Sequence, residues 1–226
     1  MFKLLSSRGN QNYLYMLQNL REMEDQNDLI LLKKNLGLKL SQLKNQEFNS
    51  SNLQQRGVAD LIEHLCSEKI FELNSQEIQV LNASSKRSIE DLSIKTQKYQ
   101  ICLDFKSHDL YGKFCMPNLI SIERAWNYLK NEKNHLWYIF IDYKTFENIT
   151  KIEKISVHSI EELPWNSLAI QNLGKGQLQI KDNNREMKFD TPMIRALWLN
   201  RLKEEALLFI DKQIRVFQKR KEFWQK

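Results

Sequence analysis

Two acidic side chains and one lysine are spaced so that they could act together on a phosphate ester. Asp91 begins one short extended segment, and Asp104 and Lys106 follow the apolar run ICL thirteen positions later. If residues 89–94 and 99–105 form a hairpin, the two carboxylates lie opposite each other at one end of a sheet. The two-residue repeat of a strand then turns Asp104 and Lys106 to the same face. Such carboxylates suit Mg²⁺, which together with a lysine polarises a phosphate and orients water for in-line attack.

The same spacing has a second interpretation, in which Asp104 and Lys106 are ordinary charges at the end of a strand. A similar pattern occurs in IFIDYK, where one residue separates Asp142 from Lys144. The chain before that pattern reads as a helix and a short loop, without a second acid on a neighbouring hairpin strand. We therefore interpret Asp142 and Lys144 as solvated or structural.

Hydrophobic periodicity predicts an α/β (α+β) chain with a mixed central β-sheet flanked by helices. The strongest strand signal is LWYIFIDY, an almost continuous run of aromatic and β-branched residues that is typical of a central strand. Thr191 and Pro192 are expected to cap and open a long amphipathic helix at the end of the sequence. The other expected elements are helices over 12–45, 53–73 and 118–131 and strands within 77–106, 154–159 and 177–182.

Composition is compatible with one domain over residues 1–226, because the 226 residues are 42% hydrophobic and contain only six Gly and three Pro. The helical region at residues 1–50 offers a surface for dimerisation, or it packs against its own sheet. The net charge of +6 favours an anionic partner such as nucleic acid, although surplus lysine also serves solubility alone. The last 26 residues hold eight Lys and Arg against four Asp and Glu, and this helix either flanks DNA or exposes a solvated face.

Cysteine usage indicates a reducing compartment, since Cys66, Cys102 and Cys115 show no paired spacing. None of the four histidines stands near a cysteine in an arrangement typical of zinc sites. The first residues lack the apolar core of a signal peptide, and no apolar run approaches the roughly 20 residues that cross a bilayer. A cytoplasmic protein without membrane contact is therefore expected.

The segment from residue 91 to 121 resembles the PD-(D/E)-x-K type II restriction endonucleases, and most closely the group of HincII and EcoRV. The pattern is an acid, LD-x-K and then PN-(L/I)-IS, with the same spacings as in that group. Glu90 stands where the proline before the first acid is usual. The resemblance covers roughly residues 55–218 and is specific only over 91–121. The residues that match are Asp91, Leu103, Asp104, Lys106, Pro117, Asn118, Ile120 and Ser121.

This resemblance implies a restriction-endonuclease-like fold and Mg²⁺-dependent cleavage of double-stranded DNA at a short palindrome, giving 5′-phosphate and blunt ends. Asp91 and Asp104 would hold the metal, and Lys106 would position or activate the water. The upstream helix often adds an acid, for which Asp60 aligns better than Glu63; either residue is otherwise a solvent-facing charge. A palindromic target implies a homodimer, and a cognate DNA methyltransferase is expected in the same system without direct contact.

Two loops are candidates for reading the DNA. Asn118 either pairs with adenine or caps a helix. Ser107, His108 and Lys113 are candidates for phosphate contacts. Cys115 stands at the family's intercalating position but is smaller than the intercalating side chain, and the alternative is that its neighbours Phe114 and Met116 pack in the core. In QNLGKGQLQI, Gln171, Asn172 and Lys175 offer groups that bind bases and phosphates, with a plain β-turn as the alternative.

Two other functions fit the same residues. One is a DNA-repair nuclease of the same fold that recognises DNA structure instead of sequence. The other is a non-catalytic DNA-binding protein in which the acids are structural.

Overall fold

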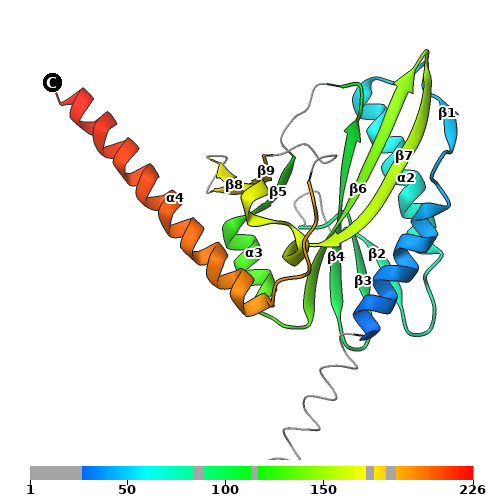
Figure 1. Cartoon of the computed structure of the whole chain (residues 1–226), viewed down its shortest axis with the longest axis horizontal. Helices are drawn as coiled ribbons and strands as arrows, with labels where there is room; N and C mark the ends of the chain where they lie inside the picture. The colour runs from blue at the N-terminus through cyan, green and yellow to red at the C-terminus, as the bar shows by residue number, and fades with distance from the viewer. Residues whose placement is uncertain (1–26, 84–88, 113–116, 172–175, 182–186, 226) are drawn as a thin grey trace, which may run out of the picture.

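The central sheet of the protein has six strands in the order β1-β7-β6-β4-β3-β2, and it curls around its helices (Figure 1). The computed structural model describes residues 27–83, 89–112, 117–171, 176–181 and 187–225. β4 and β6 are parallel and the other neighbours antiparallel, so the predicted α+β class with a mixed sheet is confirmed. The strands are β1 (Glu47–Asn49), β2 (Gln79–Asn82), β3 (Leu92–Lys95), β4 (Gln100–Asp109), β6 (Asn134–Phe146) and β7 (Ile149–Ser159).

β6 lies inside the sheet between β4 and β7, as its continuous apolar run predicts. The β6–β7 hairpin turns at Glu147 and Asn148, which both have positive φ (46° and 67°). Two successive residues with positive φ are typical of the tight turns whose twist matches that of a β-hairpin.

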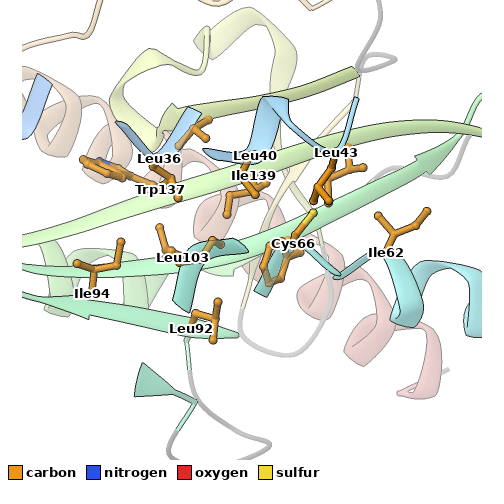
Figure 2. Close-up of a cluster of buried hydrophobic side chains, with 14 of the residues drawn as sticks. Leu36, Leu40, Leu43, Ile62, Cys66, Leu92, Ile94, Leu103, Trp137 and Ile139 are labelled. Carbon is orange, nitrogen blue, oxygen red and sulfur yellow. The ribbon is translucent and has the colours of Figure 1, made fainter. Parts of the chain in front are cut away.

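One face of the sheet is covered by α2 (Gln55–Phe71) and by a helix at residues 27–41. In Figure 2, Leu36 and Leu40 from the first helix and Ile62 and Cys66 from α2 belong to one buried cluster with residues of the sheet. The part of the predicted 12–45 helix before residue 27 lies outside the described residues. The described part packs one face against its own sheet, and its role in dimerisation stays a prediction.

A second core lies on the opposite face, between the large sheet, α3 (Ile122–Leu129), the start of α4 (Arg195–Trp224) and a small sheet. The small sheet has the order β5-β9-β8, and two 3-10 turns precede β8. Arg195 anchors α4 here, because its guanidinium binds Glu161 and donates to the carbonyl oxygens of Glu132 and Asn134. The bounds are β5 (Asn118–Ser121), β8 (Leu168–Gln171) and β9 (Gln177–Ile180), with turns at Ile160–Glu162 and Trp165–Ser167.

Two predicted helix starts are wrong. Residues 118–121 form β5 instead of the first turn of α3, because they pair with β9, far away in sequence. α4 begins at Arg195, after an N-cap residue, Ile194, that makes no capping hydrogen bond through its side chain, so Thr191 and Pro192 do not start it.

Two further observations concern the setting of the protein. Within the described residues, none of the helices is both long and apolar enough to span a bilayer. Cys66 and Cys102 are buried free thiols, and burial raises the pKa of each to about 12. Cys115 lies outside the described residues.

Candidate active site

The β3–β4 hairpin brings Asp91 and Asp104 together. Leu92 pairs with Leu103, so the next step along the ladder sets the two aspartates opposite each other. The amide N–H of Asp91 donates to the carbonyl oxygen of Leu103 (2.9 Å). Asp91 Oδ2 in turn accepts from the amide N–H of Phe105 (2.8 Å). Asp91 is also near enough to Asp104 for its charge to raise the pKa of the Asp104 carboxyl.

Lys106 lies on the same face of β4 as Asp104, and its Nζ contacts Asp104 Oδ2. Both side chains are largely buried. Below the ammonium group lies the ring of Tyr138, whose centroid is 5.8 Å from Nζ. Tyr138 is fully buried, so its ring is held in place and limits the positions that the Lys106 ammonium group can take.

The buried carboxylates of this site resist ionisation. Burial raises the pKa of Asp104 to about 7, the Asp91 charge adds to the rise, and Lys106 opposes it. Glu63 on α2 behaves similarly, since burial, Asp91 and Asp60 raise its pKa to about 7. A cation between these groups would favour their ionised forms and relieve their mutual repulsion.

α2 brings Glu63, and not Asp60, into contact with the hairpin. Glu63 Oε1 accepts a long hydrogen bond from Ser107 Oγ (3.4 Å), and Lys106 also acts on its charge. Asp60, one helical turn earlier, is exposed. The geometry therefore favours Glu63 as the additional acid, although the sequence resemblance aligns Asp60 better.

The donor set fits a hard divalent cation that keeps some of its water. Asp91 and Asp104 supply carboxylate oxygens, which Mg²⁺ prefers, and Mg²⁺ is commonly held by one or two carboxylates plus water and substrate phosphate. Among the described residues, His, Cys, Asp and Glu side chains do not gather in threes around one possible ion position. The residues that could hold such an ion are the aspartate pair, with Glu63 close by.

A buried histidine–carboxylate pair continues the same face of β4. His108 Nδ1 lies 3.3 Å from Asp142 Oδ1, and the two residues are partners in the parallel β4–β6 register. Both side chains are about nine-tenths buried, so of the two interpretations of Asp142 the structural one holds. Lys144 pairs instead with Glu153 (3.3 Å).

Asn118 does not cap a helix. It begins β5, and its Oδ1 accepts from Nε2 of Gln179, its partner on β9. Ser121 is the N-cap of α3 and accepts from the amide of Arg124 (3.4 Å). The capping alternative for Asn118 is therefore wrong, and base contact stays a prediction.

Some of the other predicted DNA-contact residues lie in strands, and the rest lie outside the residues that the structure describes. Ser107 and His108 belong to β4 and not to a loop, because β4 extends to Asp109. Gln171 ends β8, which forms a hairpin with β9. Lys113, Cys115, Met116, Asn172 and Lys175 lie outside the described residues.

Comparison with known proteins gives likenesses to solved structures, among which 75 chains match. Neither protein-family models nor curated proteins match the sequence. Among solved structures, the NlaIV restriction endonuclease aligns with a TM-score of 0.49 and 11% identity, over 77% of this chain and 78% of that chain.

Proposed function

We propose that the protein is a Mg²⁺-dependent endonuclease that hydrolyses phosphodiester bonds in double-stranded DNA. The observation that carries this proposal is the convergence of Asp91, Asp104 and Lys106 at one end of the β3–β4 hairpin, with Glu63 beside them. On the sequence pattern from 91 to 121, the finer proposal is a type II restriction endonuclease of the HincII and EcoRV group. It would cut a short palindrome as a homodimer and leave blunt, 5′-phosphorylated ends, with a cognate methyltransferase in the same system.

Each side chain has a role that follows from its place. Asp91 and Asp104 would hold the cation, whose Lewis acidity would polarise the scissile phosphate and lower the pKa of water. Lys106, fixed between Asp104 and Tyr138, would donate to a non-bridging phosphate oxygen or hold the attacking water. Glu63 would accept the proton of that water. Water adds to phosphorus as the P–O3′ bond breaks, so the products are a 5′-phosphate and a 3′-hydroxyl.

Digestion of plasmid DNA tests the proposed function. Wild-type protein with Mg²⁺ is expected to give discrete fragments, whose sequenced ends define the target and show whether the cut is blunt. Ca²⁺ is expected to support binding without cleavage. Structure-dependent nicking without discrete fragments would favour the repair nuclease, and binding without cleavage in Mg²⁺ would favour the non-catalytic protein.

The two acids of α2 are separated by a matched pair of substitutions. Glu63→Gln is expected to lower the single-turnover cleavage rate about 100-fold or more, the lower range of what a general base contributes. Asp60→Asn also removes one negative charge but leaves the contact between Glu63 and Ser107 intact. Its cleavage rate should therefore stay within about threefold of wild type. The reverse order of effects would assign the role to Asp60.

His108 is expected to bind backbone phosphate, with Asp142 fixing its orientation. His108→Gln should weaken binding about fivefold, equally for target and non-target DNA, since phosphate contacts carry no sequence information. His64→Gln is the matched control, because His64 is an exposed histidine of α2. Binding measured in Ca²⁺ by fluorescence anisotropy checks both variants, and a loss confined to target DNA would contradict the phosphate role.

A further inference from the structure

The C-terminal half of α4 extends away from the rest of the protein, and a row of uncovered apolar side chains runs along it. Figure 1 shows the helix leaving the body beyond α3, and within α4 the residues Trp198 and Leu202 near its start are buried. Larger exposed patches on soluble proteins mark interaction surfaces. The exposed apolar side chains beyond these two are Leu207, Leu208, Ile210, Ile214, Val216, Phe217, Phe223 and Trp224.

Five of these side chains recur at the spacing of a helix–helix seam. Leu207 and Ile214 are seven residues apart, and so are Ile210, Phe217 and Trp224. Together they give the alternating three- and four-residue steps that keep one stripe of a helix facing a partner helix. The surface therefore has the pattern that packs against another helix.

Charge divides along the same helix. Residues 204–211 carry Glu204, Glu205 and Asp211 and no Lys or Arg, whereas residues 212–221 carry five Lys and Arg and no Asp or Glu. Arg201 pairs with Glu204 and Glu205 (3.6 and 2.6 Å), but such exposed pairs contribute little. Two copies of α4 side by side in antiparallel orientation would set each acidic half against the basic half of the other. Duplex DNA would attract only the basic half.

We propose that four residues of this row, Leu207, Ile210, Ile214 and Phe217, bind the same four residues of a second copy of the chain, with the two α4 helices antiparallel. A two-fold axis near Lys212 would bring Leu207 of one copy opposite Phe217 of the other, and Ile210 opposite Ile214. Such a contact is self-complementary in shape and charge, as a two-fold interface requires. It deepens the proposed homodimer but does not depend on nuclease activity.

Sedimentation equilibrium without DNA tests the pairing. Wild type is expected to be a dimer, and Ile210→Glu combined with Phe217→Glu should raise the dimer dissociation constant at least about 100-fold. Leu208→Glu is the matched control, since Leu208 is as exposed as its neighbour Leu207 (64% and 54%) but lies outside the row. A monomeric wild type at 100 micromolar (about the upper working range), or equal weakening by the control, would overturn the proposal.

Disulfide trapping tests the orientation. Leu207→Cys with Phe217→Cys should form covalent dimers on mild oxidation, whereas Leu207→Cys alone should behave like wild type. Dimers from the single variant would indicate parallel helices and overturn the antiparallel arrangement. If the glutamate variant loses DNA affinity while its dimer is unchanged, α4 binds DNA and the proposed partner is wrong. Neither readout involves cleavage, so an inactive protein would refute the proposed function without affecting this result.

Discussion

Asp104→Asn is expected to lower DNA cleavage in Mg²⁺ at least about 10³-fold, because it removes a charged ligand from a site where the cation supplies several kcal/mol of transition-state stabilisation. DNA affinity measured without a divalent ion should change little, since Asp104 would act on the DNA phosphate through the cation and not by direct contact. Single-turnover cleavage and anisotropy on the same DNA give the two quantities.

The same substitution is expected to stabilise the fold. Burial raises the pKa of Asp104 to about 7, so at pH 8 the folded protein holds a carboxylate against a desolvation penalty. A neutral amide avoids this penalty. Lys106 loses its contact with the carboxylate but keeps the charge of Glu63 nearby, so the net gain should be about 1–2 kcal/mol in the free energy of unfolding. Urea denaturation at pH 8 in EDTA measures it.

Asp109→Asn is the control for both effects, since Asp109 ends the same strand and its carboxylate accepts from the amide of Tyr111 (3.0 Å). It should cleave DNA like wild type and gain no stability. Full cleavage by Asp104→Asn would remove Asp104 from the catalytic assignment. Loss of cleavage together with loss of stability would mean that the aspartate is structural.

The Asp91–Asp104–Lys106 group could be predicted from the sequence because everything that builds it is local. Four residues separate β3 from β4, so the hairpin register follows from the alternation of the strands. The two-residue repeat then fixes which side Lys106 takes. The apolar run of β6 was equally informative, because a continuous run indicates a strand buried on both faces.

What the sequence could not supply depends on partners far along the chain. The sequence left open whether Asp142 is solvated or structural, because its partner, His108, becomes a neighbour only through the parallel pairing of β4 and β6. A helix cap stayed open as the alternative to base contact for Asn118 because β9, which makes its segment a strand, comes almost sixty residues later. The choice of Glu63 over Asp60 depends on the rotation of α2 about its axis. Two acids three residues apart on one helix do not reveal which of them faces the hairpin.

Without a divalent ion, the fold is expected to become less stable as the pH rises. In EDTA, Asp104 has a folded-state pKa of about 7 against 3.8 when unfolded, and Glu63 about 7 against 4.5. The folded protein therefore holds more protons between these values. The stability that this uptake supplies is complete below about pH 4 and is lost as the pH rises through about 7.

Other groups titrate in the same range, so the measured quantity is a difference between proteins. Burial and Arg195 lower the pKa of His135 to about 3, which makes the fold less stable as the pH falls below 6.5. Wild type and Asp104→Asn share His135, so its contribution to the unfolding free energy cancels in the difference between them. Protonation of Asp104 should add about 2 kcal/mol to the stability of wild type between pH 8 and pH 5.5, so the variant should lose its advantage in EDTA over this range.

Saturating Mg²⁺ at pH 8 should reverse this advantage. A cation held by Asp91 and Asp104 offsets the cost of the buried charge, and at ten to a hundred times its dissociation constant it adds about 1.4–2.7 kcal/mol to the unfolding free energy of wild type. Asp104→Asn, with half of the aspartate pair, should gain much less, and Asp109→Asn should gain as much as wild type. Equal stabilisation of all three proteins by Mg²⁺ would mean that the ion binds elsewhere, and no stabilisation of wild type would mean that the paired aspartates need the DNA phosphate to complete the site.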